Sequence, residues 1–312
     1  MLVSVIIPCY NVAPYLDACL QSVVAQTHRP LEVWIVDNNS TDNTLEIARR
    51  WAARYPDWMR VLEEATPGAP AARNRGLAAA TGAWVQFLDA DDLLLPHKIA
   101  RQVAAARGTA AGMIVSGCHY RLNGKWGIYR PDPGVPAPIG AIRGHLGQTI
   151  SNLYRRNALR WREGLGAGQD LDFIYQYALA GPVRHTADLD CHKLDRPSGQ
   201  ISQQDPVVFL TTVFELRRTL VDQLRAHAPE LADRYAHTLY AELWRMPLRL
   251  ATTHPVAALR LYRRLGPPPP GWQPLPGDRI RPVVATLFRW LPARSFYLVI
   301  FGAHKIRLFV RS

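Results

Sequence analysis

Along the first ninety residues, short apolar runs alternate with segments whose apolar side chains recur at helical spacing. The runs at 2–7, 31–36, 59–62 and 84–88 have the length and the β-branched or aromatic content of buried strands. The segments between them carry one apolar face, or small residues closed by a glycine, and each indicates a helix. This alternation of strand and helix predicts a parallel sheet with crossover helices.

After residue 95 the pattern is less regular. It predicts a helix over 96–107, a strand over 112–120 and a strand over 149–154. Asn123-Gly124 lies between two short apolar stretches and predicts a hairpin with a type I′ turn. A glycine-rich segment then leads to Asp170 and a helix that runs through Ala180.

The C-terminal third has helical periodicity and no strand signal up to residue 265, followed by a proline-rich stretch. We therefore expect four parts: an α/β domain over 1–206, a helical extension over 207–266, a linker over 267–278 and a tail over 279–312.

Polar residues follow three of the predicted strands at the point where each strand ends. Residues 8–11 (PCYN) follow the first strand, Asp37 ends the second, and Asp89 and Asp91 follow the fourth. In parallel sheets, ligands bind outside the carboxyl ends of the strands. We therefore expect these residues to meet at one edge of the sheet.

Three carboxylates stand in four positions at the end of the fourth strand: Asp89, Asp91 and Asp92. Like charges this close raise a pKa or recruit a cation. Mg²⁺ and Mn²⁺ take oxygen ligands, often one or two carboxylates together with substrate phosphates. The pattern therefore indicates a metal–diphosphate site, and the alternative is a solvated acidic turn before the next helix.

The composition indicates the cellular compartment of the protein more clearly than the reaction that it catalyses. The 312 residues suffice for one or two domains, and the four cysteines form no C-x-x-C pair, which indicates free thiols in a reducing compartment. The N-terminus reads as a strand, not as a signal peptide, and no apolar run reaches 18 residues, so we expect a cytoplasmic protein without a spanning helix.

The net charge of +12 has its greatest local excess at the C-terminus. Seven basic residues and no acidic residue lie in 279–312, among many aromatic and aliphatic side chains. This composition predicts an amphipathic anchor on an anionic membrane surface, on the inner face of the cell membrane. The alternative is a C-terminal helix docked on the preceding domain. Because the basic excess is concentrated in a Trp- and Phe-rich tail, we expect no nucleic-acid partner.

Four motifs in order resemble the family 2 glycosyltransferases with the GT-A fold: VSVIIPCYN, EVWIVDNNSTDNT, ARNRGLAAATGAWVQFLDADD and GQDLDF. The resemblance covers residues 2–205. It implies an α/β fold with a mostly parallel central sheet flanked by helices. It also implies an inverting, metal-dependent transfer of sugar from a nucleotide-sugar donor, usually a UDP-sugar.

The resemblance further implies a nucleotide-sugar site on the donor side. Three residues after the first strand would line the nucleoside pocket: Pro8, Tyr10 and Asn11. Asp37 would accept a hydrogen bond from the base, and Arg73 would lie near the nucleotide or brace the carboxylates. Asp89 would face the ribose, and Asp91 would coordinate Mn²⁺ or Mg²⁺ between the donor phosphates.

On the acceptor side, Asp170 matches the second acid of the family's Glu-Asp motif and would act as general base. Gln169 stands where the family usually has Glu. A basic residue near CHKLDRPSGQIS would touch the diphosphate or metal; the candidates are His192, Lys193 and Arg196. From the residues alone, a helix N-cap is the preferred interpretation of Asp170.

Other functions are weaker matches. A dehydrogenase would carry G-x-G-x-x-G after the first strand, and a sugar-phosphate nucleotidylyltransferase would carry a glycine-rich basic loop there. A catalytically silent, membrane-associated assembly protein stays open because of Gln169. We expect a peripheral membrane enzyme that adds a sugar to a lipid-linked or cell-surface polysaccharide precursor.

Overall fold

The computed structural model describes residues 1–195, 205–251 and 253–273. It divides into two compact units: residues 1–165 with 169–199, and residues 166–168 with 200–312. The expectations for Arg196, for 274–278 of the linker and for the tail over 279–312 lie outside the described residues.

The first unit is built on a seven-stranded sheet of order β10-β6-β9-β4-β1-β2-β3. Its strands are β1 (Val3–Cys9), β2 (Leu31–Asp37), β3 (Met59–Glu63), β4 (Trp84–Phe87), β6 (Met113–Val115), β9 (Leu153–Arg155) and β10 (Val183–His185). Strands β3, β2, β1 and β4 pair in parallel, β9 is antiparallel to both β4 and β6, and β10 is parallel to β6. The predicted parallel sheet is confirmed.

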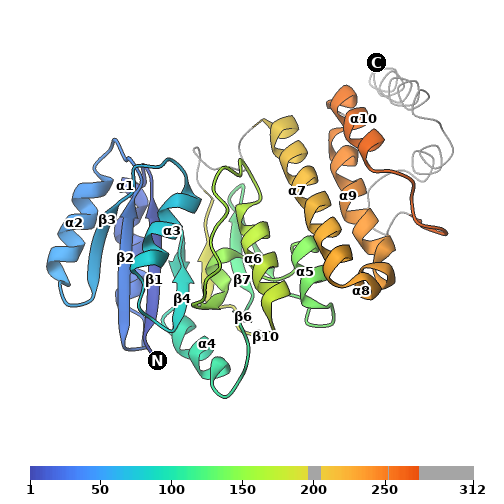
Figure 1. The fold of residues 1–312 in the computed structure, drawn as a ribbon. Helices are drawn as coiled ribbons and strands as arrows, with labels where there is room; N and C mark the ends of the chain where they lie inside the picture. The colour runs from blue at the N-terminus through green and yellow to red at the C-terminus, as the bar shows by residue number, and fades with distance from the viewer. Residues whose placement is uncertain (196–204, 252, 274–312) are drawn as a thin grey trace. The chain divides into compact units, whose positions relative to one another are not determined.

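Helices cover both faces of this sheet (Figure 1). They are α1 (Ala13–Val24), α2 (Thr44–Arg54), α3 (Ala69–Ala79), α4 (Lys98–Ala106), α5 (Ala137–Arg143) and α6 (Gln169–Ala180). Side chains of α1, α2 and α4 join those of one sheet face in a single buried cluster. On the other face, α3 approaches β1 so closely that a Cβ on Gly76 would lie 2.5 Å from Ile6 Cγ2, and Phe173 of α6 contacts Phe87 of β4.

The first strand is longer than predicted. We expected it to end before Pro8, but β1 continues to Cys9, and Pro8 lies opposite Val36 of β2. On its other side, pairing with β4 ends where the Leu88 N–H donates to the Ile6 carbonyl. Backbone groups two residues apart on a strand point to the same side, so an N–H at Pro8 would point toward β4, as the Ile6 carbonyl does. The pairing with β4 has already ended at Leu88, so the missing N–H of Pro8 costs no hydrogen bond.

The predicted strand over 112–120 is wrong as one element. It is divided between β6 in the first sheet and β7 (Cys118–Leu122) in a second sheet of order β5-β11-β7-β8. The other strands of this sheet are β5 (Leu93–Leu94), β8 (Lys125–Tyr129) and β11 (Cys191–Lys193). The hairpin is confirmed: Asn123 and Gly124 both have positive φ, and β7 pairs antiparallel with β8.

The prediction for 149–154 is partly correct, because Thr149–Ser151 forms a 3₁₀ turn and only Leu153–Arg155 is a strand. The sequence pattern did not predict β5, β10, β11 or α5. These elements have two to seven residues, too few to establish a periodicity.

The second unit is helical, as predicted, with α7 (Pro206–His227), α8 (Pro229–Arg234), α9 (Ala236–Leu250) and α10 (Pro255–Arg264). Asp205 caps α7 by accepting hydrogen bonds from the N–H groups of Val207 and Val208. Trp272, which we assigned to the linker, is buried in the apolar cluster of this unit and donates to the His237 carbonyl.

All four cysteines are buried free thiols, as predicted. In residues 1–195, 205–251 and 253–273, no helix combines the length and the apolar character that crossing a membrane requires.

Candidate functional site

The carboxyl ends of β1, β2 and β4 meet at one edge of the sheet, which confirms the expected convergence. Cys9 lies opposite Asp37, and Ile6 lies opposite Phe87, two residues before Asp89. The polar segments after these strands are therefore neighbours although up to 80 residues separate them in the sequence.

Asp37 is buried at the end of β2 with one carboxylate oxygen satisfied and one not. Its Oδ2 accepts from the Ser40 N–H at 3.2 Å. Its Oδ1 has no hydrogen-bond partner among the described residues. A buried oxygen left without a donor is costly, so Asp37 is suited to accept an N–H from a bound molecule.

The segment after β1 is held by the segment after β2. Asn11 has φ +50°, its Oδ1 accepts from the Thr41 N–H at 2.8 Å, and its own N–H donates to Ser40 Oγ. The side chain of Asn11 therefore joins two loops. Tyr10 beside it is 59% exposed, and Pro8 lies within β1.

Arg73 of α3 contacts Asp89 directly. Its Nη2 donates to Asp89 Oδ1 at 2.7 Å, and the guanidinium lies over the Trp161 ring, 4.3 Å from the ring centroid. Of the two positions expected for Arg73, this geometry corresponds to bracing the carboxylates. Trp161 was missed, although a large aromatic residue within the polar segment RRNALRWREG was a usable signal.

The two acids that follow Asp89 are both buried. Asp92 Oδ1 accepts from the Leu194 N–H at 2.8 Å. Burial and the negative charges of Asp89 and Asp91 raise the pKa of Asp92 well above its usual range. Asp89 and Asp91 thus lie close enough to disfavour ionisation of Asp92, as the spacing of the three acids predicts.

Asp170 is brought to the same edge by the direction of α6. Phe173 stacks edge-on against Phe87 at the end of β4, whereas Tyr177 donates to the Arg155 carbonyl, opposite the start of β4. The helix therefore runs from the carboxyl edge of the sheet toward the opposite edge. Asp170, in its first turn, lies at the carboxyl edge.

Lys193 of β11 is the cation around which these acids gather. Burial alone would lower the pKa of its ammonium group, but the charges of Asp92, Asp170 and Asp89 outweigh that effect and raise it. Its Nζ also donates to Gln148 Oε1 at 2.8 Å. One half-buried cation therefore feels the charges of acids from two separate motifs.

Of the basic residues expected near the diphosphate, the structure brings Lys193 among the carboxylates, and His192 points to the opposite face of β11. The His192 ring contacts His119 and Trp126, and burial followed by the neighbouring His119 lowers its pKa. Side chains alternate along a strand, so adjacent residues cannot both face the acids.

Gln169 uses its amide to hold the start of α6. Its Nε2 donates to the Leu165 carbonyl at 2.8 Å. A carboxylate at this position could not donate that hydrogen bond. The local structure therefore gives a physical reason for Gln where the resembling family has Glu.

The acids fit a divalent cation shared with a ligand. In the part of the chain that is described, no three His, Cys, Asp or Glu side chains lie where they alone could hold a metal ion. A cation at Asp91 would take its other ligands from phosphate oxygens and water, as Mg²⁺ commonly does. The charges of Asp89 and Asp91, which raise the pKa of Asp92, favour a cation there.

Comparison with known proteins gives two kinds of match. The sequence model of glycosyl transferase family 2 matches residues 4–167. An uncharacterised glycosyltransferase of Nostoc sp. is 47% identical over 103 residues, 33% of this chain and 32% of the relative. The glycosyltransferase AglE of Haloferax volcanii is 40% identical over 116 residues, 36% of this chain and 38% of the relative. The chain thus spans about a third of the length of these relatives.

Two solved structures share the fold at low identity. Residues 1–349 of TarS of Staphylococcus aureus, in complex with UDP-GlcNAc, are 20% identical, with 85% of this chain and 80% of that TarS fragment covered and a TM-score of 0.63. The mannosyltransferase PcManGT of Pyrobaculum calidifontis, in complex with GDP-Man and Mn²⁺, is 21% identical, with coverage of 98% and 86% and a TM-score of 0.58. The α/β fold class expected from the sequence is confirmed.

Proposed function

Because this chain belongs to glycosyl transferase family 2, we propose that it transfers a sugar from a nucleotide-diphosphate sugar to a hydroxyl group of an acceptor. The observation that carries the proposal is the meeting of the segments after β1, β2 and β4 at the carboxyl edge of the sheet, where Arg73 binds Asp89 and Asp37 has a buried oxygen without a partner among the described residues. That edge is where open α/β sheets bind ligands.

We propose a UDP-sugar as donor. The unpartnered Oδ1 of Asp37 would accept an N–H of the base, and the loops joined by Asn11 would hold the nucleoside. TarS is described with UDP-GlcNAc and PcManGT with GDP-Man, so a nucleotide-diphosphate sugar is common to both. Asp91 would hold Mn²⁺ or Mg²⁺, which stabilises negative charge on a diphosphate leaving group.

We further propose that transfer inverts the sugar's configuration. The acceptor oxygen would attack the anomeric carbon from the face opposite the diphosphate. One carbon–oxygen bond forms as the bond to the diphosphate breaks, and the diphosphate takes the bonding electrons. Asp170 would take the proton of the acceptor hydroxyl, which makes the oxygen a stronger nucleophile.

The acceptor that we propose is a lipid-linked or cell-surface polysaccharide precursor, reached from an anionic membrane surface on the cytoplasmic side. The basic, aromatic composition of residues 279–312 supports this part of the proposal.

A donor panel tests the function. Binding of UDP-, GDP- and dTDP-sugars would be measured by calorimetry with and without Mn²⁺. Nucleotide release would be followed with lipid-linked and soluble saccharide acceptors. We expect binding that Mn²⁺ strengthens, and loss of that Mn²⁺ effect in Asp91→Ala but not in Asp57→Ala, whose carboxylate is exposed and distant in sequence.

A second pair of variants separates binding from chemistry. Asp170→Asn should keep donor binding and reduce transfer by about 10²–10⁴-fold, because it removes the proposed base. Full transfer activity in Asp170→Asn would refute its role. A wild-type protein that binds donor without transferring sugar to any acceptor would favour the silent assembly protein instead.

A further inference from the structure

The hairpin formed by β7 and β8 carries a concentration of exposed apolar side chains. In the described part of the chain, large apolar side chains are exposed at eight positions, and four of these lie in the hairpin: Tyr120, Leu122, Trp126 and Ile128. The exposed fractions of the last three are 60%, 55% and 54%. Single exposed apolar residues are ordinary on protein surfaces, but a cluster of them marks a contact with a partner or a membrane.

These four side chains lie on both faces of the hairpin. Leu122 lies directly opposite Lys125, and side chains alternate along each strand. Tyr120 and Leu122 therefore share one face, whereas Trp126 and Ile128 lie on the other. A protein partner with a defined surface would cover one face, but the fluid interface of a lipid bilayer surrounds an inserted tip and covers both. The arrangement therefore favours lipid.

The charge of the hairpin has the sign that an anionic bilayer attracts. Residues 118–130 contain Arg121, Lys125 and Arg130 and no acidic residue. Asp195 forms an ion pair with Arg121 at 2.7 Å and so offsets one of these charges. The remaining excess is positive, and basic residues at a surface attract anionic lipid. Tryptophan and tyrosine, each with an apolar ring and a polar atom, are enriched at the level of the lipid headgroups.

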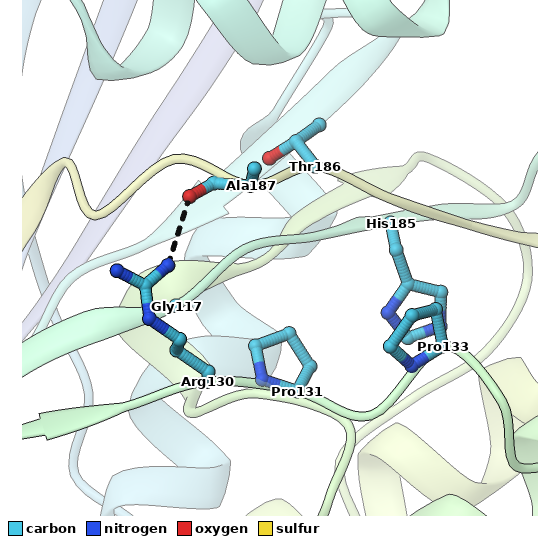
Figure 2. A pocket seen from close by; sticks show the side chains of 7 residues that line it. All are labelled: Gly117, Arg130, Pro131, Pro133, His185, Thr186 and Ala187. Atoms are coloured by element: carbon cyan, nitrogen blue, oxygen red, sulfur yellow. Dashed lines mark hydrogen bonds between the residues drawn. The ribbon is translucent and has the colours of Figure 1, made fainter.

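The base of the hairpin is fixed to the rest of the first unit. Tyr129 is half-buried, and its hydroxyl donates to the Gly144 carbonyl at 3.1 Å and accepts from the Gly147 N–H at 3.0 Å. Arg130, the residue after β8, donates to the Ala187 carbonyl at 3.4 Å, as Figure 2 shows. A tip that is presented on a fixed base loses little conformational entropy when it binds.

The hairpin adjoins the candidate site. Strand β7 pairs in parallel with β11, and Tyr120 lies opposite Lys193. Lys193 is the cation that feels the charges of Asp89, Asp92 and Asp170. Lipid around the tip of the hairpin would therefore lie beside the strand that carries Lys193.

We propose that the tip of the hairpin, residues 120–128, inserts into the headgroup region of an anionic bilayer. From Tyr120 to Leu122 the strand rises about 7 Å, at roughly 3.3 Å per residue. Interfacial segments bury their apolar face to a depth of about 5–10 Å, so the insertion is shallow. Lipid contact by the hairpin is independent of the proposed function, whereas the presentation of a lipid-linked acceptor to the candidate site rests on it.

An environment-sensitive fluorophore at the tip tests the insertion. The four native cysteines are buried, so a thiol-reactive NBD label on Leu122→Cys in the full chain would be selective. The vesicles would contain phosphatidylcholine, phosphatidylserine and a nitroxide lipid that quenches either near the headgroup or near the bilayer centre. We expect a blue shift of the emission on binding and stronger quenching near the headgroup. The same label on Ala110→Cys, an exposed residue before β6, should show neither change.

Two results would overturn the proposal. If the label on Leu122→Cys does not shift while the protein sediments with the vesicles, the membrane contact lies elsewhere. If a blue shift appears without vesicles and grows with protein concentration, the hairpin binds a second copy of the chain instead.

Unlabelled variants measure what the apolar side chains contribute. Ile128→Thr keeps a β-branched residue, which suits a strand, and should weaken sedimentation with the vesicles about fivefold. Leu122→Ser should weaken it about tenfold. Val208→Thr is the matched control, because Val208 of α7 is 58% exposed and lies outside the hairpin. Equal weakening by Ile128→Thr and Val208→Thr would contradict a specific role of the hairpin.

The hairpin, the anchor in 279–312 and the transferase activity fail in different ways. If the label on Leu122→Cys shifts while neutralising the arginines of 279–312 leaves vesicle binding unchanged, the hairpin stands and the anchor is wrong. If the label shifts while no nucleotide sugar binds, the hairpin stands and the proposed transferase activity is wrong.

Discussion

At the scale of single residues, Arg73 connects the candidate acids to the apolar core. Its guanidinium bonds Asp89 at 2.7 Å and stacks on the buried ring of Trp161. Lysine keeps the charge but loses both the planar fork and the stacking surface. We expect Arg73→Lys to lower the free energy of unfolding by about 1–3 kcal/mol and to weaken donor binding.

Arg75→Lys is the matched control for that change. Arg75 lies on the same helix but is exposed, so its replacement should alter neither urea unfolding nor donor affinity measured by calorimetry. If Arg73→Lys changed stability and donor affinity as little as Arg75→Lys does, Arg73 would act only through its charge.

Lys98 gives the protein a distinct dependence of stability on pH. Its ammonium group is fully buried against Gln86 and the Asn152 carbonyl, and burial lowers its pKa from 10.5 to about 7. Between pH 7 and 10 the unfolded chain therefore holds a proton that the folded chain has released. Stability should rise with pH across this window, by at most about 1.4 kcal/mol per pH unit from this group.

The measurement is urea unfolding at several pH values from 6 to 9. Lys98→Met should lose this contribution to the slope, whereas Lys125→Met, which replaces an exposed lysine, should retain it. The absolute stability of Lys98→Met is not the readout, because Gln86 also loses a donor. The same slope in wild type and Lys98→Met would show that Lys98 stays charged in the folded state.

For single residues, the sequence predicted their place along the sheet edge better than their side-chain contacts. Asp37, Asp89 and Asp91 could be placed at one sheet edge because each follows a strand with a clear pattern. The contact between Arg73 and Asp89 was only one of two positions that the family resemblance implied, because it depends on how α3 packs on the sheet. Lys193 lies on a three-residue strand, so no periodicity indicated which of its neighbours faces the acids.

At the scale of elements, Gly117 marks the point where the chain leaves the first sheet for the second. A Cβ there would lie 2.5 Å from Leu189 Cδ2 and 2.5 Å from the Tyr129 carbonyl oxygen. The backbone oxygen cannot move away without disturbing β8. We expect Gly117→Ala to lower the free energy of unfolding by about 1–3 kcal/mol, measured by urea unfolding.

Gly181→Ala is the control, since a Cβ on Gly181 meets nothing within 4 Å. Equal stability of the two variants would mean that the junction between β6 and β7 relaxes freely. This junction also explains the wrong prediction of one strand over 112–120. The stretch GMIVSGCHY has apolar residues on both sides of Ser116-Gly117, and the close approach of Leu189 and the Tyr129 carbonyl to Gly117 is a long-range contact that the local pattern does not carry.

At the scale of the whole molecule, the parallel pairing of the first four strands followed from the alternation of strands and helices. The pairing in the other half of the sheet did not follow from this alternation. Strand β9 enters between β4 and β6 from about 65 residues further along the chain and runs antiparallel to both. Short strands inserted at long range carry little local signal, because their pairing is decided by tertiary packing.

The membrane proposal also belongs to this scale, and it depends on where charge is placed rather than on its total. Basic residues near an anionic surface contribute about 1 kcal/mol each. Replacing Arg279, Arg281, Arg289 and Arg294 with Gln in the full chain should therefore weaken binding to phosphatidylserine-containing vesicles by about three orders of magnitude.

The control removes the same charge elsewhere, by replacing the exposed Arg54, Arg60, Arg75 and Arg107 with Gln. Both variants have the same net charge, so a nonspecific attraction would weaken equally in both. An anchor in 279–312 predicts that only the first variant leaves the vesicle pellet. High salt should weaken vesicle binding of the wild-type protein only in part. Salt screens the attraction to the lipid headgroups but leaves the burial of aromatic side chains intact.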